Sequence, residues 1–309
     1  MKTADIPLKR IVMAGLWLFL IPMVNFSSPV GANDPGAYAL AQYTLTITKS
    51  GDGSGLVTST DGGINCGADC SQAYDQGKVV NFTITPDAGS ALAGVSGDAE
   101  CADIYWGIQM FSDIACNVEF RLTTKNIFLS SAAYDGWIRE STETSGVGGV
   151  MHSTSNVLNV GDTAKDQQLL SIVSFDTASL PDNAVVSYAE VALKQQGQVG
   201  SDFSNFIGRQ IDIVTGFFGD SPNLQLTDFQ AAASLGTPPK ELVVTGDWWR
   251  FILRNKFQPL VNLSGLTQFR VHYGAGDNDN GATDYYRFYS GNFAGKASRP
   301  RLVIEYYVP

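Results

Sequence analysis

Short runs of alternating apolar and polar residues recur in the first third of the chain. Residues 43–48 and 116–122 alternate and contain β-branched side chains, and 56–58 and 78–85 are further short runs of the same kind. A two-residue period is typical of strands that bury one face. Glycine-rich and proline-containing turns separate the runs. The pattern therefore predicts a small β-domain over residues 43–123.

A second and larger set of strand-like runs fills residues 127–309, separated by turn sequences such as Leu-Pro-Asp-Asn at 180–183. One short helix is predicted at 227–233, where Thr227 can cap the first turn and alanines follow. Many short strands with little helix predict a two-sheet β-sandwich or jelly roll, and an all-β chain overall. The predicted strands are residues 136–140, 157–160, 169–175, 185–193, 211–217, 269–273, 285–288 and 302–306.

Composition narrows the possible functions. A length of 309 residues suggests two domains, and only 16% of the residues are charged. The net charge of -10 and a pI of about 4.6 describe an acidic surface that repels phosphate backbones. Nucleic acid is therefore excluded as an expected partner.

The N-terminus has the pattern of an export signal. Lys2, Lys9 and Arg10 precede an apolar run at residues 11–23, and small residues suitable for cleavage end at Ala32. We expect a signal peptide at 1–32 and a flexible leader at 33–42, with an uncleaved membrane anchor as the alternative. No later run is long and apolar enough to predict a transmembrane helix. The protein is expected to be secreted or at the cell surface, with the periplasm left open.

All four cysteines lie in the first domain, and export makes their oxidation expected. Four cysteines allow three pairings. We predict Cys66–Cys70 and Cys101–Cys116, with a zinc site as the alternative. The second bridge closes a loop that would stabilise the domain by about 3 kcal/mol in the chain-entropy model.

The first domain resembles the divergent B-repeat of bacterial surface proteins, which is related to the internalin B-repeat. The similar stretches are LTITKSG at 45–51, INCGADCS at 64–71 and VVNFTITP at 79–86. Trp106 lies in an insertion between the last two cysteines, a departure from the family pattern. The resemblance implies a spacer or adhesive module.

The second domain resembles the DNRLRE family, which is similar to a class of carbohydrate-binding modules with a jelly-roll fold. The similar stretches are LNVG at 158–161, LSIVSFD at 170–176, LPDNAVV at 180–186, LTQFR at 266–270 and RPRLVIEY at 299–306. The resemblance implies glycan binding in some members and a surface role in others.

Catalytic chemistry is not predicted. His152 and His272 are the only histidines, and neither completes a recognisable catalytic motif with the Gly-Asp-Ser turn at 219–221. Carboxylate pairs such as Asp135 with Glu140 remain as an alternative for glycoside cleavage. We therefore expect a protein that is not an enzyme.

Two binding functions are predicted for the second domain, since aromatic faces and convergent polar groups recognise sugars. A polysaccharide is the first expected partner. A structural role, as an adhesin or a fibre subunit that pairs with its own copies, is the alternative. A calcium site is predicted in the loop at 277–284, with Asp277, Asp279 and Asp284 as ligands. The candidate aromatic platforms are Trp137, Trp248, Trp249, Tyr285, Tyr286 and Tyr289.

Overall fold

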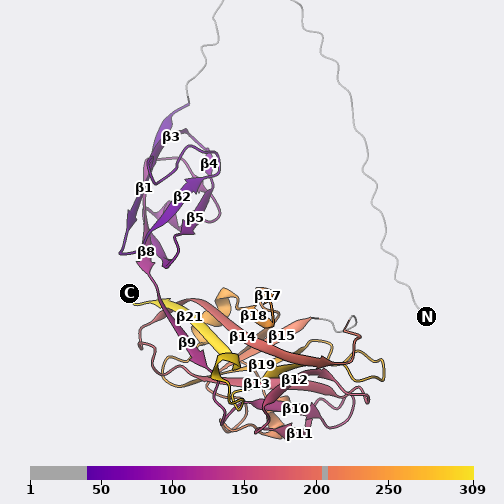
Figure 1. Cartoon of the computed structure of the whole chain (residues 1–309). Helices are drawn as coiled ribbons and strands as arrows, with labels where there is room; N and C mark the ends of the chain where they lie inside the picture. Colours follow the sequence, from indigo (N-terminus) through magenta and orange to yellow (C-terminus); the bar gives the residue numbers. More distant parts are fainter. Residues whose placement is uncertain (1–39, 204–207) are drawn as a thin grey trace, which may run out of the picture. The chain divides into compact units, whose positions relative to one another are not determined.

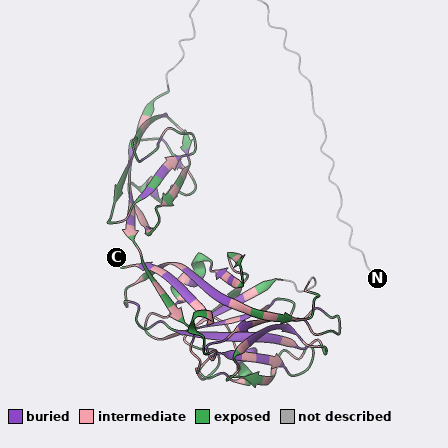
Figure 2. Cartoon of the chain, in the orientation of Figure 1, coloured by how far each residue is buried: buried purple, intermediate pink, exposed green. Residues whose placement is uncertain are grey.

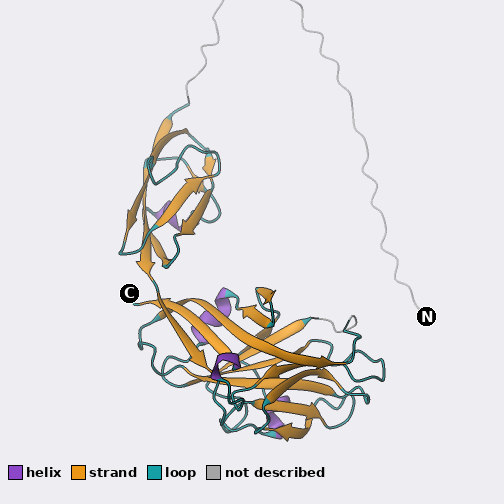
Figure 3. Ribbon diagram, viewed as in Figure 1, coloured by secondary structure: helices purple, strands orange, loops and turns teal. Residues whose placement is uncertain are grey.

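The structure is a computed structural model that describes residues 40–203 and 208–309, and strands dominate it (Figures 1 and 3). The predicted signal peptide lies outside the described residues, as does all of the predicted leader before Leu40. Within the described ranges, no helix combines the length and the apolar character that a membrane crossing needs.

The first domain is built on a mixed four-stranded sheet with the order β3-β1-β8-β6. Its central strands β1 and β8 are parallel, and the outer strands pair with them antiparallel. Two small antiparallel ladders, β2 with β5 and β4 with β7, complete it. The elements are β1 (Gln42–Ser50), β2 (Gly55–Ser59), β3 (Ser71–Asp75), β4 (Val79–Val80), β5 (Phe82–Pro86), β6 (Ser90–Gly97), η1 (Ala99–Asp103), β7 (Ile108–Gln109) and β8 (Ile114–Leu122).

Both predicted disulfides are confirmed, because Cys66 is bonded to Cys70 and Cys101 to Cys116. Alternation along β8 buries Val118 and Phe120 in the same cluster as the second bridge. The single strand predicted at 78–85 is wrong, however. It divides into β4 and β5 at Asn81, whose carbonyl oxygen accepts a hydrogen bond from the Thr60 amide instead of joining a ladder.

The second domain is a β-sandwich, so the predicted all-β class is confirmed. One sheet, called the β14–β21 sheet, has the order β17-β18-β14-β21-β9. The opposite sheet, called the β13–β19 sheet, contains the other strands. The first sheet comprises β9 (Thr124–Leu129), β14 (Val185–Val199), β17 (Glu241–Thr245), β18 (Trp248–Ile252) and β21 (Arg301–Tyr307). The second comprises β10 (Gly136–Glu140), β11 (Gly148–His152), β12 (Val157–Asp162), β13 (Gln168–Asp176), β15 (Arg209–Thr215), β16 (Leu235–Thr237), β19 (Leu266–Tyr273) and β20 (Tyr285–Tyr289).

The main core lies between these two sheets, as the purple stretches along their strands show in Figure 2. Val191 and Leu193 of β14 face this core, together with Phe175 of β13 and Phe269 of β19. The rings of Phe175 and Phe269 meet edge to face, with centroids 6.0 Å apart. Alternation thus sends every second side chain of each sheet into one shared apolar layer.

Strand β13 is buried on both faces. Leu170 and Ile172 point away from the main core into a second cluster, where Phe218, Leu224 and Phe229 cover them. The segment that carries these three residues therefore forms an additional layer over the outer face of the β13–β19 sheet. Burial on both faces explains why β13 reads as a nearly continuous apolar run.

The helix predicted at 227–233 is wrong. Only a short 3-10 turn, η2 (Leu226–Phe229), forms there, and Gln225 rather than Thr227 is its N-cap. The guanidinium of Arg270 accounts for the early end, because its Nη1 donates to the carbonyl oxygens of Asp228, Phe229 and Ala231 at 2.9, 3.0 and 2.9 Å. A continuing helix would need the first two carbonyls for its own backbone bonds.

Within the described part of the chain, no β-ladder joins a strand before Thr123 to a strand after it. One residue, Thr123, separates β8 from β9, and its amide donates to the Gly89 carbonyl oxygen. Backbone contacts nevertheless group Ala41–Pro309 as one unit. The predicted boundary between residues 123 and 127 therefore stays a prediction.

The two disulfides are expected to stabilise the first domain unequally, because they close loops of different length. Replacing Cys101 and Cys116 together by alanine should lower the free energy of unfolding by about 3 kcal/mol, and replacing Cys66 and Cys70 by about 2 kcal/mol. Guanidinium unfolding under non-reducing conditions measures both losses. A larger loss for the shorter loop would contradict the argument.

Candidate functional site

The outer face of the β14–β21 sheet presents apolar and charged side chains that lie outside the main core, of which Glu190, Ala192 and Val303 are buried. Along β9, Ile127 and Leu129 are 55% and 40% exposed, whereas Phe128 between them packs against the main core. None of the side chains on this face belongs to a hydrophobic cluster of the described residues. We call it the open sheet face; its residues are Ile127, Leu129, Glu190, Ala192, Lys194, Trp248, Arg250, Arg301 and Val303.

Cross-strand register brings these residues together. Ala192 of β14 is paired with Arg250 on one side and with Arg301 on the other. Lys194 is paired with Trp248, one step along the same face. The centre of the face is a hollow of about 160 Å³ lined by Trp248, both arginines, Ile127, Glu190, Ala192 and Val303.

The charged side chains of this face differ in whether they have a partner of opposite charge. Arg250 donates from Nε to Oε1 of Glu190 at 2.9 Å, and the Tyr188 hydroxyl donates to the other carboxylate oxygen. Burial, together with this hydrogen bond, raises the pKa of Tyr188, so the hydroxyl stays a donor. Arg301 and Lys194, in contrast, form no ion pair with any described residue. Arg301 instead lies over the Trp248 ring, 4.5 Å from its centroid.

The two adjacent tryptophans of β18 have opposite roles. Trp248 belongs to the open sheet face, while Trp249 is 6% exposed and its indole N–H donates to Gln195 Oε1 at 3.0 Å. The Trp249 ring packs against Tyr286 at 4.6 Å and Phe288 at 5.4 Å. Of this pair, only Trp248 is placed to meet a ligand from solvent.

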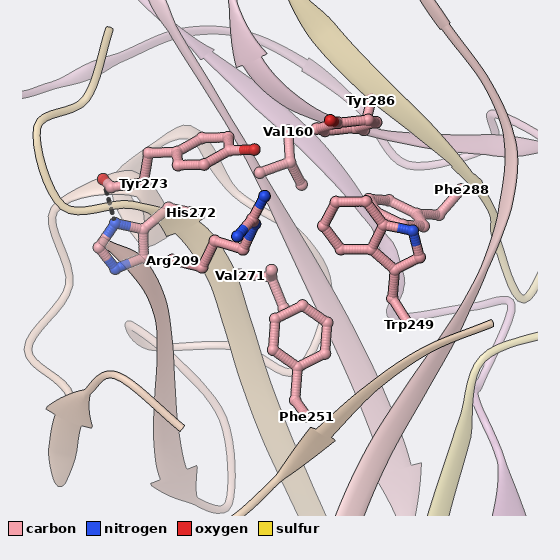
Figure 4. Close-up of a pocket in the computed structure, with 9 residues that line it drawn as sticks. All are labelled: Val160, Arg209, Trp249, Phe251, Val271, His272, Tyr273, Tyr286 and Phe288. Carbon is pink, nitrogen blue, oxygen red and sulfur yellow. Dashed lines mark hydrogen bonds between the residues drawn. The ribbon is translucent and has the colours of Figure 1, made fainter. Parts of the chain in front are cut away.

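Figure 4 shows the pocket around Trp249, between the two sheets. Arg209 reaches over the Trp249 ring, 5.1 Å from its centroid, and Tyr273 and Tyr286 close the space above them. The cavity measures about 10 Å³, room for about one water molecule. A sugar ring does not fit into it. Trp249 is part of the main core and Tyr286 packs against it.

The other predicted aromatic platforms are spread over different parts of the second domain. Trp137 of β10 stacks on His152 of β11, with centroids 4.2 Å apart. Tyr289 packs against Phe293 at 4.3 Å, and Tyr285 is half-buried on the same strand. Of the six predicted residues, the structure brings only Trp249 and Tyr286 into contact with each other through a ring pair.

The predicted calcium ligands are in different environments. Asp284 is 1% exposed and accepts hydrogen bonds from the amides of Ser201 and Asp202 and from the side chains of Asn278 and Asn280. These donors occupy the oxygens that a cation would need. No group of three metal-ligating side chains is arranged for a metal in residues 40–203 and 208–309. Calcium binding stays a prediction, with Asp277 and Asp279 as the freer ligands.

The candidate catalytic groups have structural contacts. His272 donates from Nδ1 to its neighbour's carbonyl oxygen at 2.9 Å, and its Nε2 lies 3.3 Å from Asp212 Oδ2. Glu140 accepts from the amides of Gly146 and Gln168 at 2.6 and 3.2 Å. Asp135 is fully buried and accepts from two backbone amides. These contacts fix loops and strand ends.

Sequence reasoning missed Glu190, Arg250 and Arg301, which surround the hollow beside Trp248. They lie on three different strands, and only the antiparallel register makes them neighbours. The available signal was the spacing of charges inside otherwise apolar strands, because a charged residue at an alternating position marks the solvent face.

No family model and no curated protein matches the chain, so the resemblances to the B-repeat and DNRLRE families stay predictions. Among solved structures, the chain is similar to the major pilin subunit BcpA of Bacillus cereus, with 8% identity and a TM-score of 0.19 over 75% of this chain and 58% of that one. The major pilin SpaD of Corynebacterium diphtheriae matches with 8% identity and a TM-score of 0.20, over 75% and 56%. This chain thus spans a little over half the length of these pilins. Such TM-scores do not establish a shared fold, and function has to be argued from this chain's own surfaces.

The second domain is expected to be more stable at mildly acidic pH than at pH 8. Burial raises the pKa of Asp135 to about 7 and the pKa of Asp162 and of Asp228 to about 6. The folded state therefore holds these protons more tightly than the unfolded state, whose carboxyls titrate near 3.8. The free energy of unfolding should fall as pH rises from about 4 to 7 and then level off.

Thermal unfolding between pH 4.5 and 8 measures this slope. Asp135→Asn should reduce the slope, because it removes the group with the highest pKa. Asp61→Asn is the control: the hydrogen bond from the Ser59 hydroxyl lowers the pKa of Asp61, so the effect of this carboxyl on the slope lies below pH 4. A slope that survives Asp135→Asn unchanged would sink the assignment.

Proposed function

We propose that this chain is an exported structural or adhesive protein of the cell surface or extracellular matrix, and that it acts by contact through its outer surfaces. The supporting observation is the asymmetry of the sandwich. The β13–β19 sheet has its outer face covered by the segment around Phe218 and Phe229, whereas the open sheet face keeps Ile127 and Leu129 exposed. Apolar residues clustered on one face mark an interaction surface.

Two further features favour a contact role over an enclosed ligand. The pocket around Trp249 is too small for a sugar, and the buried carboxylates Asp135, Asp162 and Asp284 accept hydrogen bonds from backbone amides.

The disulfides of the first domain support the extracellular location. This domain has a thin core for its many turns, and two disulfides offset this weakness. Disulfides are typical of proteins that function outside the cell.

Self-association is the expected result for the mature protein, and Ile127→Glu should weaken it at least tenfold. The glutamate removes apolar area from the open sheet face and adds a negative charge to it. Val308→Glu is the control, because Val308 is 44% exposed and lies beyond the last strand. Sedimentation velocity over a range of concentrations, with negative-stain microscopy, measures the effect.

A wild-type protein that stays monomeric at every concentration, with and without calcium, would overturn self-association. Equal association of wild type and Ile127→Glu would mean that another surface is responsible. The melting temperature of each variant checks that its fold is intact.

Polysaccharide binding at the same face is the second candidate. The hollow beside Trp248 combines one aromatic face with two arginines and a carboxylate, the mixture with which proteins hold sugars. Trp248→Ala should weaken binding of a polyuronate about fivefold in affinity gels, since an aromatic contact contributes about 1 kcal/mol. Leu122→Ala, which removes an exposed side chain of the other domain, is the control. Unaltered binding by Trp248→Ala would remove this site.

A further inference from the structure

The first domain exposes three large aromatic side chains close together in sequence. Trp106 is 84% exposed, Tyr105 61% and Phe111 56%. They lie on a segment that runs from η1 through β7 to the start of β8, and we call residues 98–113 the aromatic loop. Aromatic side chains are rarely left in water, and they are enriched in the contact regions of protein interfaces.

The aromatic loop is anchored to the core of the first domain. Cys101 is bonded to Cys116 of β8, and Ile104 and Ile108 are buried in the core of the domain. The amides of Trp106 and Gly107 both donate to the Asp103 carbonyl oxygen at 2.8 Å. A loop fixed in this way loses little conformational entropy when it binds.

The charge of the aromatic loop restricts its partner. It contains Asp98, Glu100, Asp103 and Asp113 and no basic residue. None of these carboxylates forms an ion pair within the described residues. Anionic membranes and nucleic acids are repelled by such a loop. A partner with apolar area and unpaired cations is complementary to it.

The open sheet face of the second domain has these properties. Arg301 and Lys194 lack a carboxylate partner among the described residues, and Ile127 and Leu129 supply exposed apolar area beside them. The hollow next to Trp248 is open to solvent and wide enough for an aromatic side chain. Arginine beside tryptophan also favours a further aromatic ring, through cation–π contact.

We propose that the aromatic loop of one copy binds the open sheet face of a second copy, with Trp106 at the hollow beside Trp248 and Arg301. The inference rests on the proposed structural function and names its partner. Each copy then offers one loop and one face, and the two surfaces differ. Contacts of this heterologous kind leave a free surface at each end, so they build open chains unless the rotation closes a ring.

Mixing two complementary variants tests the proposal. Trp106→Ala removes the loop's anchor but keeps the open sheet face, and its high exposure means that folding should be unaffected. Arg301→Glu keeps the loop but reverses the charge of the face. Each variant alone is expected to be monomeric, at least tenfold weaker than wild type in association. An equimolar mixture should form dimers and nothing larger, because every remaining surface of the dimer is a mutated one.

Lys194→Glu replaces Arg301→Glu if the latter lowers the melting temperature, and it should behave in the same way. Leu122→Ala, which removes an exposed apolar side chain of the first domain outside the loop, is the control and should associate like wild type. Sedimentation velocity gives the species in each mixture. Dimers in the mixed sample, with monomers in a sample of the double variant Trp106→Ala and Arg301→Glu, support the proposal.

Two failures are distinguishable. If wild type associates and Ile127→Glu prevents it, but Trp106→Ala associates normally, the open sheet face binds a different partner surface and only this inference is overturned. If wild type is monomeric throughout, both this inference and the self-association that it extends are overturned.

Discussion

The sandwich depends on one strand that is hydrogen-bonded into both of its sheets. The first part of β14 pairs with β18 and β21, whereas residues 195–199 pair with β20 of the opposite sheet, with an irregularity between Gln195 and Gly197. A bulge of this kind bends a strand and lets it turn the corner of a sandwich. The spacing of the sheets, the core between them and the outward position of Ala192 and Lys194 all follow from the path of β14.

Buried carboxylates fix the loops around this frame. Asp135 links the amides of Ser174 and Gly291, and Asp162 links those of Asn278 and Asp284. Each therefore joins segments that are more than 35 residues apart in the chain. Carboxylates that accept backbone amides satisfy the desolvated groups on both sides. These hydrogen bonds give each of the two buried carboxyl groups a structural role in holding the loops that it joins.

The two outer faces of the sandwich differ, because one is covered by a second core and the other is the candidate contact surface. A second core covers the outer face of the β13–β19 sheet. Arg270 donates hydrogen bonds to backbone carbonyl oxygens of the segment that forms this core, and its Nε donates to Asp212 Oδ2 at 2.8 Å. The open sheet face contributes no residue to this second core, and its cations Arg301 and Lys194 have no carboxylate partner among the described residues. In a chain with 30 acidic and 20 basic residues, such a face is complementary to much of the chain's own surface.

The sequence by itself determined the all-β class, the positions of most strands and both disulfides, because alternation, turn residues and close cysteine spacing are local properties of the chain. It did not determine the interruption of the predicted strand at Asn81 or the early end of η2, since the Thr60 amide and the Arg270 guanidinium that cause them come from distant positions. Nor could it separate Trp248 from Trp249, or place Trp248 beside Arg250 and Arg301. Those neighbours lie on different strands, and only the register of the β14–β21 sheet decides which side chains share a face.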